Sequence, residues 1–374
     1  MAHIEDRRRE GRGWRVRYRA PDGRERSQSF TKKGDADDFA STVETDKIRG
    51  VWVDPQRGKL TVAEWAESWL STKTDLRPTS RVRLEGIVRT HVLPAFGNVA
   101  LSEVGNAAIR KWVASIAEAG LGPSTARKSF NALAQMMRAA ISDRRIAFNP
   151  CEDVPLPPEH FGEQRFLTSA EVEDLALVIE ERFSAFVLLA AYGGLRFGEL
   201  AGLRRRNVDA LRGRVTVSET LVEANGELSF GPPKTRRSRR TIPLPRRVAT
   251  ALRDHLDRYV APDPGALVFT GSKGAPLRRA GFRRCYWLPA LRRVGLDGLK
   301  VHELRHTFVA LWVAAGRNPK EVSVAAGHST VAFTLDRYGH LYETTDEDVQ
   351  DRLDALLPNP VAAPARPAVM SLLR

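Results

Sequence analysis

Residues 302–307 read His-Glu-Leu-Arg-His-Thr, and this stretch decides how the fold is interpreted. A helix that begins here places His302 and Arg305, three residues apart, on one face. The other polar candidates stand at the ends of predicted helices or in turns, in four motifs: Gly194-Leu-Arg196-Phe-Gly198-Glu199, Pro232-Pro-Lys234-Thr235, Gly327-His328-Ser329 and Asp336-Arg337-Tyr338-Gly339. We predict that these motifs contribute to a single site.

The predicted site combines two arginines, a lysine, two histidines and a tyrosine, which suits phosphoryl transfer without a metal ion. The transition state spreads negative charge over the non-bridging oxygens, where fixed guanidinium groups stabilise it. A tyrosine hydroxyl can act as the nucleophile, and a lysine can protonate the leaving hydroxyl. The sequence offers no evident acidic cluster for two-metal chemistry. We therefore expect an enzyme that uses neither a metal nor a cofactor.

The charge of the chain favours a polyanionic partner. Its 374 residues include 59 Lys+Arg against 45 Asp+Glu, which gives a net charge of +14 and an isoelectric point near 10.2. Arginine supplies 48 of the 59 basic residues, and it binds phosphate in a bidentate manner. An arginine-rich codon usage would explain that ratio equally well, but the net charge favours nucleic acid as the partner.

Several classes of protein are excluded by composition. With 42% hydrophobic residues the chain can form cores, so it is not a wholly disordered basic protein. The two cysteines, Cys151 and Cys285, exclude a disulfide framework and a cysteine-rich zinc site. We find no secretory signal and no apolar run of membrane-spanning length. We expect a cytoplasmic protein with no membrane partner.

Shifts in composition divide the chain into five segments. Residues 1–58 predict a small mixed domain, 59–148 a helical domain, and 149–164, with four prolines, an extended linker. Residues 165–357 predict a mixed domain with short strands and many helices. The tail, 358–374, is rich in Pro and Ala, and we expect it to be disordered.

The first segment predicts a ββα unit. Two strands are expected over 12–30 and a helix over 34–49. Residues 7–33 hold 11 basic and 3 acidic side chains. Strand alternation places the basic residues on one face and apolar residues on the other, and the basic candidates for DNA binding here are Arg15, Arg17 and Arg19. An ordinary solvated sheet face is the alternative.

Basic residues also recur in the later segments. On the predicted helices of the second segment we select Arg81, Arg127 and Lys128 as DNA-binding candidates. Residues 204–247 hold 12 basic and 4 acidic side chains, and Arg236 and Arg237 within them are further candidates. Charge of this kind binds phosphate without reading bases.

Six residues together resemble the signature of the integrase-type tyrosine recombinases, R…K…HxxR…H…Y, and they are Arg196, Lys234, His302, Arg305, His328 and Tyr338. The resemblance extends over nearly the whole chain apart from the tail. It implies a multidomain α+β fold: a small ββα arm-type DNA-binding domain, a helical core-binding domain, and a mixed, mainly helical catalytic domain with a small antiparallel sheet.

The resemblance also implies a role for each residue. Tyr338 would attack the scissile phosphate, Arg196 and Arg305 would hold its oxygens, and Lys234 would act as the general acid. The remaining two, His302 and His328, would assist proton transfer and orient the phosphate.

Some choices have alternatives in the sequence. Tyr342, one helical turn after Tyr338, is the second candidate nucleophile, and Lys273 is the second candidate lysine. We interpret Glu199 as a structural partner of an arginine. His306 is interpreted as a helix-stabilising or supporting residue, with DNA contact as the alternative.

The function implied is integration of a phage or mobile element at an attachment site, through a 3′-phosphotyrosyl intermediate and a Holliday junction. The partners implied are double-stranded attachment-site DNA, three further copies of the chain in a tetramer, a host DNA-bending factor and an excisionase. Val349, Leu353 and Leu356 recur at helical spacing, and they pack either on their own domain or on a neighbouring subunit. The competing functions are a non-catalytic DNA-binding protein and a type IB topoisomerase-like relaxase.

Overall fold

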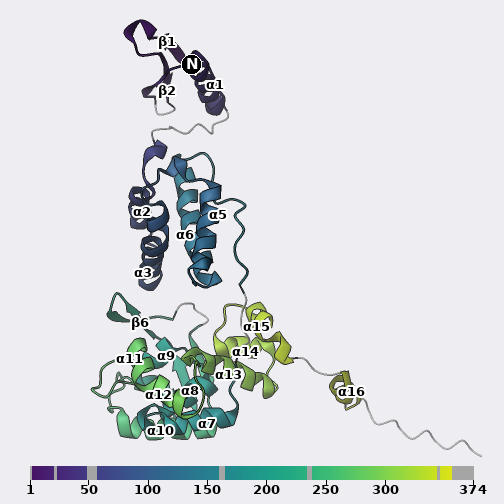
Figure 1. The fold of residues 1–374 in the computed structure, drawn as a ribbon. Helices are drawn as coiled ribbons and strands as arrows, with labels where there is room; N and C mark the ends of the chain where they lie inside the picture. The colour runs from purple at the N-terminus through teal and green to yellow at the C-terminus, as the bar shows by residue number, and fades with distance from the viewer. Residues whose placement is uncertain are drawn as a thin grey trace, which may run out of the picture. The chain divides into compact units, whose positions relative to one another are not determined.

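The computed structural model describes residues 2–20, 23–48, 57–159, 165–233, 238–342 and 346–355 (Figure 1). The chain divides into two compact units, Met1–Gly162 and Glu163–Arg374. No helix among these described residues is long and apolar enough to cross a membrane.

The first unit begins with a three-stranded antiparallel sheet. Its strands β1 (His3–Asp6), β2 (Trp14–Arg19) and β3 (Glu25–Phe30) lie in the order β1-β2-β3, and helix α1 (Lys33–Ile48) packs against them. Their small core includes Val16, Tyr18, Ala36 and Val43. The structure thus adds a third strand to the predicted ββα unit. At four residues, β1 is too short to show an alternating pattern in the sequence, and pairing with β2 stabilises it.

The rest of the first unit is helical. It consists of the α-helices α2 (Val62–Ser71), α3 (Pro78–Ile87), α4 (Leu93–Phe96), α5 (Asn106–Glu118) and α6 (Pro123–Ser142), with 3₁₀ turns η2 (Arg57–Lys59) and η4 (Leu101–Glu103). A second core, separate from that of the small sheet, lies among these helices and includes Trp65, Trp69, Ile109 and Met136. A capping box begins α2, since Thr61 and Glu64 exchange hydrogen bonds.

Two segments of this unit differ from what their prolines suggest. Pro normally ends a helix, but the helix that begins at Pro78 continues through a π-helical segment, η3 (Val88–Val92), directly into α4, which contains Pro94. The N–H of Leu93 bonds the Val88 carbonyl, five residues back, and this wider turn accommodates a residue without an N–H. The start of the expected linker is also packed, because Cys151 and Val154 are buried against the helical core.

The second unit is mainly helical with small sheets. Its helices and short turns are α7 (Ser169–Val178), η5 (Glu181–Phe183), α8 (Ser184–Gly193), α9 (Phe197–Ala201), η6 (Arg205–Asn207), α10 (Arg246–Tyr259), α11 (Arg279–Phe282), η8 (Arg283–Trp287), α12 (Leu288–Arg293), α13 (Val301–Ala314), α14 (Pro319–Ala326), α15 (Val331–Tyr338), η9 (Gly339–Tyr342) and α16 (Asp346–Asp354). Strands β4 (Val208–Asp209), β5 (Arg214–Val217) and β8 (Arg240–Pro243) form one antiparallel sheet. Strands β6 (Thr220–Ala224) and β7 (Glu227–Gly231) form a hairpin. Small antiparallel sheets were expected for this domain, and the structure has them.

Helix α8 is the central element of this unit. Every residue from Ala185 to Ala191 is buried, and the helix packs against α7, α10 and α13. It ends at Gly194, whose φ is +64°, and a Cβ there would lie 2.4 Å from the ring of Phe308 on α13. Only glycine combines this backbone conformation with so close an approach. The turn that follows α8 therefore lies directly on α13.

Candidate active site

Five of the six signature residues come together at the ends of four helices. Arg196 is the N-cap of α9, whereas His302 and Arg305 lie in the first two turns of α13. His328 directly follows Gly327, the C-cap of α14, and Tyr338 is the last residue of α15. The sixth residue, Lys234, lies outside the described residues.

Arg305 is a buried cation held by two main-chain carbonyl groups. Its side chain donates to the oxygens of Gly194 (2.6 Å) and Ala326, at the ends of α8 and α14. Burial, together with the positive charges of Arg196 and Arg240, lowers the pKa of Arg305 below its usual value. A guanidinium stays charged in proteins, so this group presents a concentrated positive charge to an incoming anion.

Arg196 is fixed by the helix that it caps. Its backbone N–H and its Nη1 donate to the two carboxylate oxygens of Glu199, both at 2.9 Å, and its Nη2 donates to the carbonyl oxygen of Gly327 at 3.1 Å. The side chain of Arg196 is 37% exposed. It is therefore oriented by the protein and still accessible to a ligand.

The carboxylate of Glu199 also binds a second arginine, Arg240, which the sequence analysis did not select. Arg240 donates Nη1 and Nη2 to Glu199 at 3.2 and 2.9 Å, and its Nε donates to the carbonyl oxygen of Ala325 at 2.7 Å. Burial alone would raise the pKa of Glu199, but the charges and hydrogen bonds of Arg240 and then Arg196 hold it at about 2. The only sequence signal for Arg240 was its place in a basic run.

Tyr338 is 1% exposed and contacts two histidines. The ring of His328 stacks on it, with centroids 6.0 Å apart and planes 4° apart. The Nδ1 atom of His328 is within 2.8 Å of the Thr334 hydroxyl. Tyr338 Oη itself lies 2.5 Å from Nδ1 of His306. Burial raises the pKa of Tyr338, and Arg305 and Arg337 oppose that rise.

The three histidines of the site are neutral at pH 7. Burial, followed by the positive charges of nearby arginines, lowers the pKa of His302 to about 4 and that of His328 to about 3. For His306 the causes are burial, then His302, Arg337 and Arg305, and its pKa is also about 4. The cluster is thus electropositive through its arginines alone, and its imidazoles can accept protons.

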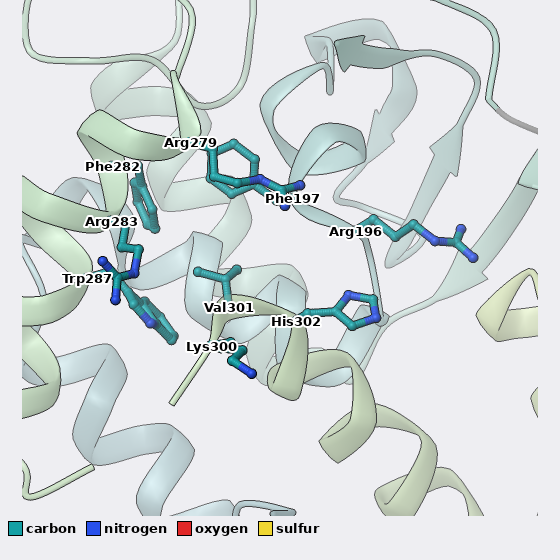
Figure 2. Close-up of a pocket in the computed structure, with 9 residues that line it drawn as sticks. All are labelled: Arg196, Phe197, Arg279, Phe282, Arg283, Trp287, Lys300, Val301 and His302. Carbon is teal, nitrogen blue, oxygen red and sulfur yellow. The ribbon is translucent and has the colours of Figure 1, made fainter. Parts of the chain in front are cut away.

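A pocket of about 430 Å³ opens beside Arg196 and His302 (Figure 2). Both side chains stand at one side of it, and those of Phe282, Arg283 and Trp287 stand at the other. The pocket is completed by Phe197, Arg279, Lys300 and Val301. Its aromatic floor and cationic rim suit a ligand that carries both a phosphate and an apolar face.

The alternatives named from the sequence lie elsewhere. Tyr342 is in η9, and its hydroxyl is buried without a hydrogen-bond partner among the described residues. Lys273 is an exposed residue in the turn between Gly271 and Gly274. The choice of Lys234 over Lys273 stays a prediction.

The selected basic residues outside the cluster occupy different settings. Arg15, Arg17 and Arg19 alternate along β2 with the buried Val16 and Tyr18, as expected for one face of a sheet. Arg17 pairs with Glu5 at 2.8 Å. The candidates of the helical domain make hydrogen bonds within the protein. Arg81 donates to Glu85, Lys128 to Ser124, and Arg127 to the carbonyl oxygen of Pro157. Arg236 and Arg237 lie outside the described residues.

No group of three or more His, Cys, Asp or Glu residues in the described part of the chain could hold a metal ion. Glu199 is the carboxylate that contacts Arg196. Both of its oxygens already accept hydrogen bonds from arginine.

Comparison with known proteins places the chain in one family. Residues 165–345 match the phage integrase family, and residues 61–117 match the N-terminal SAM-like domain of phage integrases. The prophage phiRv2 integrase of Mycobacterium tuberculosis H37Rv is 29% identical over 358 residues, which is 92% of this chain and 93% of that protein. The integrase of Mycobacterium phage L5 is 27% identical over 88% of this chain and 90% of its own.

Solved structures share the fold. The Tn1549 transposon integrase, in complex with a circular intermediate DNA, superposes with a TM-score of 0.68 at 21% identity, over 80% of this chain and 100% of that one. A lambda integrase tetramer bound to a Holliday junction gives 0.58 at 15% identity, over 92% and 96% of the two chains. The fold and the site thus define a tyrosine recombinase. The chain belongs to the phage integrase family, whose members are site-specific recombinases that integrate DNA.

Proposed function

We propose that this chain cuts and rejoins attachment-site DNA through a covalent bond to Tyr338, and so integrates a phage or another mobile element into a bacterial chromosome. The observation that carries the proposal is the convergence of Arg305, Arg196, His302 and His328 around the buried phenol. Each of these groups meets a separate need of phosphodiester cleavage.

The two arginines would bind the scissile phosphate. A guanidinium has five N–H donors, and Arg305 uses two of its nitrogens on carbonyl groups while Arg196 uses two on Glu199 and Gly327. These bonds fix both cations before DNA arrives, so little reorganisation is needed when charge develops on the phosphate oxygens.

The covalent step would exchange one ester for another. Oη of Tyr338 attacks phosphorus, the bond to the 5′ oxygen breaks, and a 3′-phosphotyrosyl link and a free 5′-hydroxyl result. Lys234 would supply the proton to that 5′ oxygen, while His302 and His328 would orient the phosphate and assist proton transfer. Because the phosphotyrosyl bond keeps the energy of the phosphodiester, rejoining requires no ATP.

The assembly follows from the same chemistry. Joining two duplexes through a Holliday junction requires four strand cleavages, and we propose that four copies of the chain, one for each cleavage, form a tetramer on double-stranded attachment-site DNA. Leu353 of α16 is 55% exposed, and we propose that α16 packs on a neighbouring subunit. A host DNA-bending factor and an excisionase would set the architecture and the direction of the reaction in the bacterial cytoplasm.

We propose that each part of the chain has its own DNA site. Residues 1–58 would bind arm-type sequences, 59–148 and 165–357 would enclose the core site, and 149–164 would connect them. The arginines of β2 support this division, since they lie on the face opposite the small core of the first domain.

The test is the formation of a covalent adduct on a nicked attachment-site substrate in the presence of EDTA. The wild-type chain should form the adduct, Tyr338→Phe should form none, and Tyr342→Phe should keep the activity. Adduct formation by Tyr338→Phe would contradict the assignment of the nucleophile. With two separate linear DNAs, products joined between partners support integration. Relaxation of a supercoiled plasmid without any such joined product supports the topoisomerase-like alternative.

A further inference from the structure

The nucleophile proposed above is in hydrogen-bond contact with a histidine that is not among the six signature residues. Nδ1 of His306 lies 2.5 Å from Oη of Tyr338, and the ring centroids are 5.8 Å apart. His306 lies one turn after His302 on α13, and α13 packs against the η9 segment that follows Tyr338. The contact therefore joins two packed elements.

From this contact, and on the basis of the proposed function, we infer that His306 accepts the phenolic proton of Tyr338 during DNA cleavage and returns it during rejoining. As Oη bonds to phosphorus, the electron pair of its O–H bond stays on oxygen and the proton moves to Nδ1. The P–O5′ bond breaks at the same time, and the 5′ oxygen takes a proton from Lys234. In rejoining, the 5′-hydroxyl attacks phosphorus and gives its proton back to Lys234, the P–Oη bond breaks, and the phenolate recovers its proton from His306.

The protonation states of the pair suit this transfer. A neutral imidazole that accepts at Nδ1 carries its hydrogen on Nε2, and the lowered pKa of His306 keeps it neutral at pH 7. Burial raises the pKa of Tyr338, so the phenol stays protonated until an acceptor removes its proton. A buried phenol that attacks at neutral pH needs such an acceptor.

The charges around the pair connect this transfer to DNA binding. The charged and titratable neighbours of the His306–Tyr338 pair come from two helices: His302 and Arg305 from α13, and Arg337 from α15. The ring of His328 stacks on that of Tyr338. The arginines disfavour a proton on His306. A bound phosphate would offset their charge, and His306 would become a stronger base only when the substrate is in place.

His328 is less suited to this role. Its ring stacks on that of Tyr338, with planes 4° apart, and among the described residues it makes no hydrogen bond to Oη. Its Nδ1 atom is within 2.8 Å of the Thr334 hydroxyl. His302 meets His306 in an edge-to-face contact at 5.1 Å, on the side of the pocket. Among these three histidines, His306 is the one with a ring nitrogen in hydrogen-bond contact with the nucleophile.

The first test is a single-turnover measurement of adduct formation by His306→Asn. The asparagine amide can occupy the place of Nδ1 and accept a hydrogen bond, but it cannot take up a proton. We expect the rate to fall about 100-fold or more, as for the loss of a general base. His340→Asn is the matched control, because His340 is an exposed histidine two residues after Tyr338, and it should react at close to the wild-type rate. Wild-type rates for His306→Asn would overturn the inference, because a hydrogen bond alone would then suffice.

A second measurement isolates the proton of the nucleophile from that of the leaving group. A substrate with sulfur in place of the 5′ oxygen expels a thiolate, which needs no proton donor. His306→Asn should remain about 100-fold slower than wild type on this substrate. Restoration of the rate by sulfur would overturn the inference, because His306 would then serve the leaving group.

The pH profile separates proton transfer from a merely structural role. In the DNA complex, the wild-type rate should rise with pH as His306 loses its proton, and then level off. The rate of His306→Asn should lack this rise with pH. DNA binding and thermal unfolding, measured for each variant, establish that it is folded. An unchanged rise with pH in His306→Asn would overturn the inference.

The inference and the proposed function fail in different ways. If Tyr338→Phe forms no adduct and His306→Asn reacts normally, only the role of His306 is wrong. If Tyr338→Phe forms the adduct, the nucleophile is another residue and both are wrong.

Discussion

Arg240 and Glu199 form a buried ion pair in which each side chain is 3% exposed. The same carboxylate orients Arg196, the arginine proposed to bind the scissile phosphate. Glu199 therefore connects the buried Arg240 to Arg196. The orientation of Arg196 thus depends on a carboxylate that does not have to contact DNA.

Removing the charge of Glu199 should destabilise the protein and impair cleavage together. Glu199→Gln leaves Arg240 buried without a counter-charge, which costs about 3–5 kcal/mol of unfolding free energy. The matched control is Glu173→Gln, because Glu173 pairs with Arg247, whose side chain is 71% exposed, and such a pair contributes about 0–1 kcal/mol. Urea unfolding measures both variants. Equal losses in the two variants would contradict the role given to the buried pair.

The same carboxylate predicts a dependence of stability on pH. The pKa of Glu199 is lowered from 4.5 to about 2 in the folded chain, so its contribution is complete above the unfolded pKa and is lost as pH falls through the folded one. The wild-type unfolding free energy should therefore fall more steeply than that of Glu199→Gln between about pH 5 and pH 2. Parallel curves for the two proteins would show that this pair does not control acid stability.

Gly194 should tolerate no side chain. Gly194→Ala combines a positive φ with a contact of 2.4 Å to Phe308, and strain and overpacking together should cost about 2 kcal/mol or more. Gly226→Ala is the control, since its φ is +78° but nothing lies within 4 Å of a Cβ there. Thermal unfolding should rank Gly194→Ala well below Gly226→Ala. Equal midpoints would mean that the ring of Phe308 moves aside without cost.

Deleting residues 1–58 should separate cleavage from integration. The small sheet and the helices after it have separate cores, so the helical core survives the deletion. The truncated chain should cleave a core site at close to the full rate and integrate poorly between two attachment sites. Integration at the full rate would contradict the proposal that this domain binds arm-type sequences for integration.

The sequence could indicate candidate site residues because the signature depends on local geometry. The spacing of His302 and Arg305 places them on one face of a helix wherever that helix lies. Gly194 and Gly327 could be recognised as helix ends, which fixed the positions of Arg196 and His328 along the chain. The charges on β2 followed from strand alternation in the same way.

The contacts that sequence reasoning missed depend on the fold as a whole. Arg240 meets Glu199 across 41 residues of chain, and Tyr338 meets His306 across 32. Neither separation along the chain corresponds to a helical or strand repeat, so no sequence pattern could indicate these contacts. The third strand, β1, was missed because it is short, and the π-helical turn before Pro94 was missed because Pro normally ends a helix.

The most direct test of the account is to identify the residue that becomes linked to DNA. The adduct formed on a nicked attachment-site substrate can be digested with protease and nuclease, and the modified peptide sequenced by mass spectrometry. The account predicts a nucleotide attached through its 3′ phosphate to Tyr338. A nucleotide on Tyr342 or on any other residue, or a linkage through a 5′ phosphate, would contradict it.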